Sequence, residues 1–404
     1  MKALTLDAEN QTAFVQDVTI PERGPNDVLV QVCAVALNPV DALYVFNPLG
    51  ATGRIVGSDF AGVVVAPPDQ NEKLKRGQRV AGFLQGACSV NIRPGAFAEY
   101  IICPADLVWL VPDSMTFEEA ATVSLCALTA AQAIFYRMGL QAPFPWEETS
   151  EGSKHNDSKV QNSDDGNLFS FFIYGASTSV GLYAAQLVRR SAEFAGRAIT
   201  LIGAASSGRF PMLQNEPYAY DALIDYRDEN WPERVRQLSG GGVDYAFDCI
   251  SEGSTVQLVS STLRNSRSRM AIVRSREGGA WTAEKDLLVE PVYGAVWEGL
   301  GVDIQYQNLV VSASPAARCF AVAFYRWISE EYKLQANPTR LMPGGLDRIV
   351  ADGFVLLGAG SMQDRLSERR TEPWMAPIGA VKLVYRLSSL SDTALDAIAS
   401  ISPG

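Results

Sequence analysis

The sequence predicts an α/β protein with two domains, a barrel of short strands and a doubly wound parallel sheet. Residues 1–110 contain short β-branched runs separated by Gly, Pro and Asn. Residues 169–203 read as strand, glycine turn, helix and strand, and residues 222–273 continue the alternation of strands and helices. The length of 404 residues and the hydrophobic content of 47% suit two or three domains of about 150 residues each.

The barrel is predicted from runs that are bounded by turn-forming residues. Asn38-Pro39 marks a forced turn, because the residue before a proline is pushed out of the α region. Short strands separated in this way close most readily as a compact barrel. The predicted strands cover Asp27–Ala36, Gly62–Ala66, Gln78–Phe83 and Ala96–Cys103.

A helix is predicted over Thr116–Met138. Thr116 followed by Glu119 is a capping-box pattern, and the apolar residues after it form one extended helical face. No apolar run in the chain reaches about 18 residues, so no segment is expected to cross a membrane. The N-terminus lacks the basic and apolar regions of a signal peptide, and we expect a cytoplasmic protein.

Composition argues against several classes of function. The formal net charge is −11, with 34 Lys and Arg against 45 Asp and Glu, so nucleic acid is not an expected partner. The six cysteines include no C-x-x-C motif, and His155 is the one histidine. We therefore expect neither a disulfide framework nor a structural zinc nor a histidine-based triad.

The strand-to-helix turn after Phe169–Tyr174 is a candidate phosphate site. Gly175 lets the chain turn sharply off the strand, and Gly181 lets the helix lie close against it. Backbone N–H groups at a helix N-terminus stabilise a pyrophosphate. The spacing differs from G-x-G-x-x-G, so an ordinary strand-to-helix turn remains the alternative.

The residues after the second strand of this unit favour NADPH over NADH. An acid there would bind the 2′-hydroxyl of NADH and repel a 2′-phosphate. The sequence from Ala204 to Arg209 has no acid and instead offers two serines and a guanidinium. The alternative is a solvated turn with a surface arginine.

The rest of the chain completes the two domains. Further strands are predicted over Ala222–Tyr226, Val243–Ile250 and Met270–Val273, with helices over Trp231–Leu238, Thr255–Leu263 and Cys319–Tyr332. The polar stretch 141–167 reads as a solvated loop, Ser361–Met375 as a loop insertion, and Pro377–Leu387 as a final strand. We expect one domain to comprise residues 1–137 and 333–404, and the other residues 138–332.

This pattern resembles the medium-chain dehydrogenase/reductase family, in which a GroES-like barrel domain accompanies a Rossmann nucleotide-binding domain. The matching motifs are Asn38–Asp41, Val56–Val64, Gly95–Tyr100, Tyr174–Gly181 and Lys382–Val384. Within the family the chain is most similar to the stand-alone, zinc-independent enoyl reductases of fungal polyketide synthases, the lovastatin type. The more particular shared motifs are Tyr174–Thr178, Asp225–Arg227, Asp244–Ser251 and Gly344–Leu346.

The resemblance implies reduction of an α,β-unsaturated polyketide acyl thioester carried on the acyl-carrier domain of a polyketide synthase. NADPH would deliver hydride to the β-carbon, and the α-carbon would then be protonated. The resemblance is compatible with a monomer or a homodimer, and it requires no metal, nucleic acid or membrane.

The resemblance also assigns site residues. It places Ser177, Thr178, Ser179 and Val180 at the pyrophosphate, Ser206, Ser207, Gly208 and Arg209 at the 2′-phosphate, and Tyr226 at the adenine end. It places Val40, Asp41, Ala42, Leu43, Val273, Arg274, Ile378 and Gly379 on the nicotinamide side. Thr129, Ala130 and Ala133, with Val292, Tyr293 and Gly294, would face the substrate. Thr129 could equally bond to its own helix backbone, and Tyr293 could equally be a core residue.

Two departures from the family open other functions. Leu43 stands where the relatives carry a lysine, so an ammonium that could polarise the substrate is missing. Tyr44 could replace it as a catalytic donor, or its ring could simply pack. The stretch Arg274–Gly279 is unusually charged. The alternatives are therefore a non-redox protein that binds or guides cyclisation of a polyketide, and a free-standing quinone or enone reductase.

Overall fold

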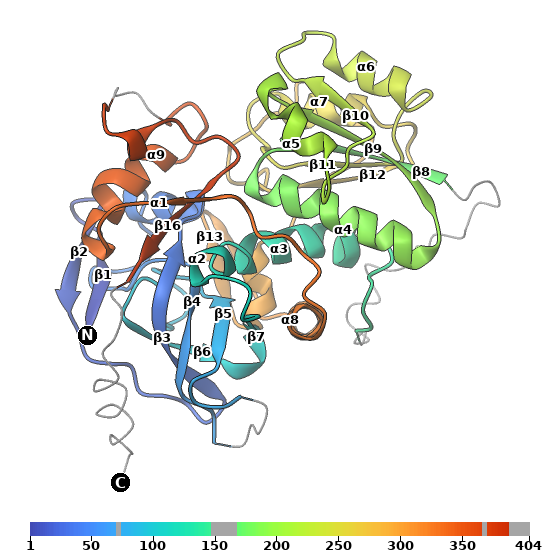
Figure 1. Cartoon of the computed structure of the whole chain (residues 1–404). Helices are drawn as coiled ribbons and strands as arrows, with labels where there is room; N and C mark the ends of the chain where they lie inside the picture. Colours follow the sequence, from blue (N-terminus) through green and yellow to red (C-terminus); the bar gives the residue numbers. More distant parts are fainter. Residues whose placement is uncertain (70–73, 147–167, 366–369, 388–404) are drawn as a thin grey trace. The chain divides into compact units, whose positions relative to one another are not determined.

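The chain folds into two compact units (Figure 1). The computed structural model describes residues 1–69, 74–146, 168–365 and 370–387. Unit 1 comprises residues 1–125, 302–305 and 325–404, and unit 2 comprises residues 126–301 and 306–324. The sequence predicted the main domain boundaries after residues 137 and 332, whereas the two units divide mainly after residues 125 and 324.

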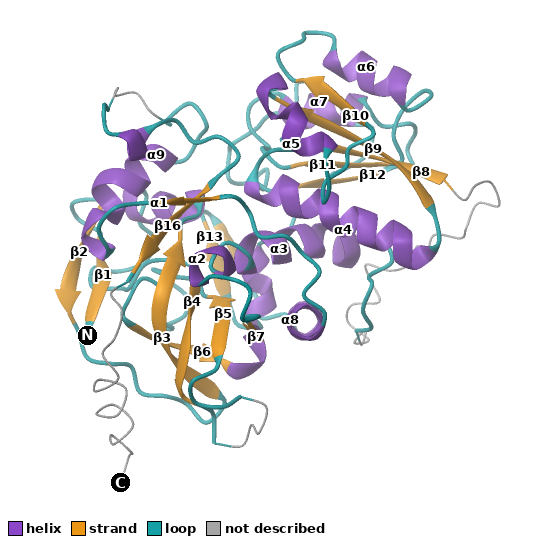
Figure 2. Cartoon of the chain, in the orientation of Figure 1, coloured by secondary structure: helices purple, strands orange, loops and turns teal. Residues whose placement is uncertain are grey.

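Unit 1 is organised around a seven-stranded sheet with the path β15-β16-β3-β4-β5-β7, on which β6 also pairs with β3 (Figure 2). A separate hairpin, β1–β2, was not predicted. All four predicted barrel strands are present, with β3 matching its expected bounds. The bounds are β1 Lys2–Asp7, β2 Thr12–Asp17, β3 Asp27–Ala36, β4 Asp59–Ala66, β5 Arg79–Phe83, β6 Tyr100–Pro104, β7 Val108–Leu110, β15 Thr339–Leu341 and β16 Lys382–Arg386.

The C-terminal part of the chain returns to this sheet. Strand β16 pairs antiparallel with β3, with Val384 opposite Ala36, and β15 runs parallel to β16. The final strand that the sequence predicts at Pro377–Leu387 is therefore present, although shorter. Between β15 and β16 lie a 3₁₀ turn (η6, Leu346–Arg348), a π-helical turn (η7, Ile349–Phe354), helix α9 (Val355–Leu357) and a 3₁₀ turn (η8, Pro373–Met375).

The expectation of a turn at Asn38-Pro39 missed helix α1 (Pro39–Phe46). Asn38 is extended, with φ −118° and ψ 151°, as a residue before proline prefers. Proline is tolerated at the first position of a helix because the N–H it lacks would have no partner there. The same two residues therefore start a helix in this chain.

The helical stretch from Phe117 to Arg137 begins where the sequence predicts but is not uniform. The Thr116 and Glu119 capping box is formed in both directions. The stretch consists of α2 (Phe117–Ala120), α3 (Ser124–Ala131) and a π-helical turn, η2 (Gln132–Arg137). In length and composition it could span a membrane, contrary to the expectation, but 83% of the apolar window is buried within the protein, as in a core helix.

Unit 2 contains a five-stranded parallel sheet in the order β10-β9-β8-β11-β12. The chain starts at the central strand and extends the sheet first in one direction and then in the other, which is the doubly wound arrangement that was predicted. The strands are β8 Leu168–Tyr174, β9 Ala198–Ala205, β10 Ala222–Asp225, β11 Tyr245–Asp248 and β12 Arg269–Ile272. The helices after the strands are α4 Ser179–Ala195, α5 Phe210–Gln214, α6 Trp231–Leu238 and α7 Thr255–Ser261.

Unit 2 also holds the elements that follow the sheet. A 3₁₀ turn (η5, Val296–Leu300) is followed by the short strands β13 (Ile304–Tyr306) and β14 (Leu309–Val311) and by helix α8 (Pro315–Glu330). Strand β13 and helix α8 each continue across a boundary between the units. Of the predicted loop 141–167, residues 147–167 lie outside the described residues, as do residues 366–369 of the predicted insertion.

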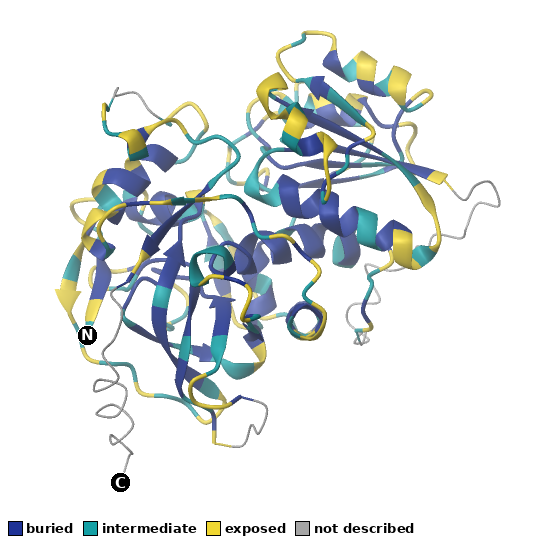
Figure 3. Cartoon of the chain, in the orientation of Figure 1, coloured by how far each residue is buried: buried dark blue, intermediate teal, exposed yellow. Residues whose placement is uncertain are grey.

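The central strands of both sheets are buried (Figure 3). In unit 2, Phe172, Ile202, Ala246 and Met270 come from four neighbouring strands and lie in one hydrophobic cluster. Each of these side chains has an exposed fraction of at most 1%. Burial on this scale is the main stabilising contribution to such a sheet.

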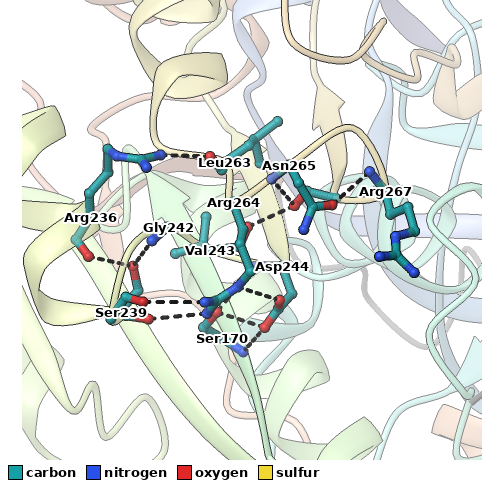
Figure 4. Close-up of polar contacts among 12 residues, drawn as sticks. Ser170, Arg236, Ser239, Gly242, Val243, Asp244, Leu263, Arg264, Asn265 and Arg267 are labelled. Carbon is teal, nitrogen blue, oxygen red and sulfur yellow. Dashed lines mark hydrogen bonds and ion pairs between the residues drawn. The ribbon is translucent and has the colours of Figure 1, made fainter. Parts of the chain in front are cut away.

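A polar cluster ties β8 and β11 together at their amino ends (Figure 4). The carboxylate of Asp244 accepts hydrogen bonds from the N–H and hydroxyl of Ser170, both 2.8 Å away, and from Nε of Arg264 at 3.1 Å. Arg264 also donates to the carbonyls of Ser239 and Gly240. This end of the sheet is therefore cross-linked by hydrogen bonds between β8 and the segments on either side of β11.

Candidate functional site

The turn between β8 and α4 contains the residues predicted to bind the pyrophosphate. Gly175 has φ +75°, and Thr178 caps α4 by accepting a hydrogen bond from the N–H of Gly181 at 3.1 Å. A Cβ at Gly181 would lie 2.4 Å from the carbonyl oxygen of Gly175. The helix N-terminus thus approaches the turn as closely as only glycine permits, and the predicted residues Ser177 to Val180 lie at the end of the turn and the start of α4.

The loop after β9 meets the loop after β10. Ser206 precedes a 3₁₀ turn (η4, Ser207–Arg209), and the N–H of Ser207 donates to Asp225 at 3.0 Å. Asp225 also accepts from the N–H of Arg227, and these two backbone hydrogen bonds hold the pKa of Asp225 below its usual value. An acid, Asp225, therefore does lie beside Ser207. It comes from the next strand, β10, so the residues around Ser206 alone could not predict it.

The carboxyl ends of β11 and β12 hold the predicted nicotinamide-side residues of unit 2. Buried Asp248 accepts from the N–H groups of Ile250 and Ser251, and its pKa is raised to about 6 by burial. The hydroxyl of Ser251 accepts from the N–H of Val273 at 3.0 Å. The next residue, Arg274, pairs with Glu252 at 3.3 Å. Both predicted residues are thus fixed by the segment that follows β11.

The two segments predicted to face the substrate lie together within unit 2. Arg137 donates from Nε to the carbonyl of Tyr293 at 3.1 Å and from Nη2 to Glu298 at 2.9 Å. A Cβ at Gly294 would lie 1.7 Å from Arg137, so glycine is needed there. Ala130 and Ala133 are buried, whereas Thr129, Val292, Tyr293 and Gly294 are half-buried.

In unit 1, four of the predicted nicotinamide-side residues, Val40 to Leu43, lie on α1, next to a buried polar network. Lys382 donates from Nζ to Asp59 at 2.6 Å and to Asn38 at 3.0 Å. Asp59 also accepts from the amide of Asn38 and from the N–H of Leu125. This network joins α1, β4, α3 and β16, which are far apart in sequence.

Asp41 lies beside this network and accepts hydrogen bonds from neutral groups. Its carboxylate accepts from the hydroxyl of Ser58 at 2.6 Å and from the N–H of Asn38 at 2.7 Å. Burial raises the pKa of Asp41 to about 7, although both hydrogen bonds act in the opposite direction. Asp41 is buried and caps α1, so its side chain orients the helix that carries Val40, Ala42 and Leu43.

The hydroxyl of Tyr44 is engaged within unit 1. It donates to the carbonyl oxygen of Gln305 at 2.9 Å, and Gln85 donates to the same oxygen at 2.7 Å. Tyr44 is buried, with an exposed fraction of 4%. The donor that the sequence offered for catalysis is therefore used to anchor the segment 302–305.

Leu43 lies beneath the segment that follows α9. Its Cδ1 atom is 3.4 Å from the place that a Cβ on Gly360 would take, and Asn47 donates to the carbonyl of Ala359. Leu43 has an exposed fraction of 8%. A lysine ammonium at this position would lose most of its hydration, which gives a physical reason for an apolar residue here.

Ile378 and Gly379 lie in the loop that leads into β16. Arg340, on β15, donates to the carbonyls of Trp374, Ala376 and Pro377 just before them. Both residues are half-buried. A cavity of about 280 Å³ lies elsewhere in unit 1 and is lined by none of the predicted site residues, although it includes the Gly344–Leu346 motif.

Comparisons with known proteins bear on the family and the fold. Residues 24–113 match the family model described as alcohol dehydrogenase GroES-like domain. The trans-enoyl reductase caaB of Aspergillus niger is 30% identical over 353 residues, which are 85% of this chain and 90% of that protein. The trans-enoyl reductase traG of Penicillium crustosum is 29% identical over 356 residues, 86% and 91% of the two chains.

Solved structures show the same fold. The CurK enoyl reductase has a TM-score of 0.66 at 18% identity and covers 95% of this chain and 98% of its own. An alcohol dehydrogenase superfamily protein from Novosphingobium aromaticivorans has a TM-score of 0.68 at 19% identity and covers 96% and 100%. These likenesses establish the predicted barrel-plus-nucleotide-domain architecture.

Replacing Gly181 with alanine tests the phosphate turn. Because the new Cβ would meet backbone oxygens, Gly181→Ala should cost about 1–3 kcal/mol of stability and abolish tight dinucleotide binding. Gly345→Ala is the matched control, because its Cβ would meet only the carbonyl oxygen of Arg386 at 3.6 Å, an ordinary contact, and Gly345 is not among the proposed cofactor residues. Thermal melting and NADPH titration of both variants measure the effect, and equal behaviour of the two would contradict the turn's role.

The buried carboxyl of Asp41 should make stability depend on pH. A carboxyl whose pKa is raised from 3.8 to about 7 by folding destabilises the folded chain as pH rises between these values, because the unfolded chain releases its proton first. Asp41→Asn removes this effect, so the melting temperature of wild type relative to the variant should fall by on the order of 5 °C from pH 4.5 to pH 8.

Asp113→Asn, at an exposed carboxyl of the same unit, is the control for Asp41→Asn. Its melting temperature should stay parallel to that of wild type across the pH range. If the melting temperature of Asp41→Asn also stayed parallel to that of wild type across the pH range, folding would not raise the pKa of Asp41 as described above.

Proposed function

Because this chain belongs to the trans-enoyl reductases of the medium-chain dehydrogenase/reductase family, we propose that it reduces an α,β-unsaturated polyketide thioester with NADPH in the cytoplasm. The partner would be a polyketide synthase that presents the acyl chain on its carrier domain. The observation that carries the proposal is the close-packed glycine turn before α4, present in a chain whose relatives are named trans-enoyl reductases.

The donor set of unit 2 fits a phosphorylated dinucleotide. The backbone of Ser177 to Val180 at the start of a 17-residue helix would hold the pyrophosphate. Ser206, Ser207, Gly208 and Arg209 would hold the 2′-phosphate, and Tyr226 would contact the adenine. The nicotinamide ring, when bound, supplies a hydride. The resemblance assigns the nicotinamide side to Val273 and Arg274 of unit 2 and, in unit 1, to Val40 to Leu43, Ile378 and Gly379.

The chain's remaining task is to hold the enoyl group and to stabilise the charge that develops on the thioester oxygen. Hydrogen-bond donors aimed at that oxygen lower the barrier because the charge is larger in the transition state than in the substrate. Of the two residues proposed for this role, Tyr44 is engaged with Gln305 and Thr129 is half-buried on α3. We propose Thr129 for the donor role because the family resemblance places it at the substrate, with Ala130, Ala133 and Val292 to Gly294 as the substrate surface.

The leucine at position 43 leaves a non-redox function as an alternative. The residue that stands in place of the lysine is packed beneath residues 359–360, so no ammonium acts from this position. A protein that binds a polyketide without reducing it would need no such group. This alternative and the free-standing quinone reductase are distinguished from the proposal by the following assay.

Purified protein should consume NADPH, measured at 340 nm, when supplied with an α,β-unsaturated acyl pantetheine thioester. The matched saturated thioester should give no consumption, and a carrier-bound enoyl chain should react with a lower KM than the free thioester. Tight NADPH binding without consumption would favour the non-redox protein. Faster turnover of simple quinones than of either thioester would favour the quinone reductase.

A further inference from the structure

The ends of β9 and β10 form a surface that carries both signs of charge. Ala205 and Asp225 are register partners on neighbouring parallel strands, so the loops that follow them start side by side. The carboxylate of Asp225 accepts from the N–H of Ser207 and from the N–H of Arg227, each at 3.0 Å. One carboxylate therefore holds together the two loops at which a ribose 2′-substituent would be read.

The guanidinium of Arg227 lies over this carboxylate. Its Nη1 atom is 3.5 Å from Asp225, its Nη2 atom is 3.4 Å from the hydroxyl of Ser206, and its central carbon is 5.2 Å from the ring centre of Tyr226. Ordinary hydrogen bonds of this kind measure about 2.7–3.2 Å. With 61% of the Arg227 side chain exposed, the guanidinium is loosely held and can turn toward an incoming anion.

The charges then decide which dinucleotide fits. An uncovered Asp225 would accept a hydrogen bond from the 2′-hydroxyl of NADH and would repel a 2′-phosphate. A guanidinium beside it compensates that charge and offers a planar set of donors to phosphate oxygens. We propose that Arg227 is a specificity-determining residue that allows a 2′-phosphate to bind beside Asp225. This inference rests on the proposed use of NADPH and adds a residue to it.

Loss of Arg227 should weaken the binding of NADPH in two ways and leave the binding of NADH almost unchanged. Arg227→Ala removes a charge-assisted hydrogen bond to the phosphate and also exposes the repelling carboxylate. Removing one such bond weakens binding by roughly 10- to 100-fold. Arg227→Lys keeps the positive charge without the planar fork, so it should retain a several-fold preference for the phosphorylated ligand.

The test uses the full chain and calorimetric titration with 2′,5′-ADP and with 5′-AMP, which differ only in the 2′-phosphate. Wild type should bind 2′,5′-ADP more tightly, and Arg227→Ala should lose at least tenfold of that preference. The matched control is Arg234→Ala, because Arg234 is also exposed but pairs with Asp228 at the start of α6. This variant should keep the wild-type preference.

Each result decides something different. Loss of the preference in Arg227→Ala alone, with 5′-AMP binding unchanged, supports the inference. An unchanged preference in Arg227→Ala overturns it and leaves the proposed use of NADPH standing. If wild type itself binds both ligands equally, the NADPH assignment fails and this inference fails with it. Because neither ligand carries a nicotinamide, all three results are independent of reductase activity.

Discussion

The ion pair between Lys382 and Asp59 is the interaction on which unit 1 depends. The two residues are separated by 323 positions in sequence, they are 2.6 Å apart, and their side chains have exposed fractions of 2% and 0%. A lone buried ammonium or carboxylate would cost several kcal/mol, so each residue requires the other. The pair joins the returning strand β16 to β4, and Asn38 extends it to the start of α1.

The same network contains two buried carboxyls, Asp59 and Asp41, which have different hydrogen-bond partners. Asp59 has the ammonium, whereas Asp41 has only neutral donors, which are the Ser58 hydroxyl and the Asn38 N–H. Burial is the main cause that raises the pKa of Asp41 to about 7, and the nearby charge of Asp59 acts in the same direction. The side chain of Asp41 accepts a hydrogen bond from the N–H of the N-cap residue Asn38 and so fixes the start of α1, the helix proposed to contact the nicotinamide.

What the sequence could predict was local. The glycine turn after Tyr174, the strands of the nucleotide sheet and the Thr116 capping box depend on residues close in sequence, and the structure contains them. Helix α1 was missed because Asn-Pro signals both a turn and a helix start. The roles of Asp225 and Lys382 were not predictable, because each depends on a partner brought near only by folding. Arg227 belonged to a recognised motif, yet only its contact with Ser206 suggests what it does.

The central claim is that this chain transfers hydride from NADPH to the β-carbon of an enoyl thioester. The most direct measurement is a single turnover with NADPH deuterated at the transferable C4 position, followed by mass spectrometry and NMR of the acyl product. The account predicts one deuterium at the β-carbon and a solvent-derived hydrogen at the α-carbon. A product without deuterium, or an unchanged enoyl thioester recovered from a complex that binds NADPH, would contradict it.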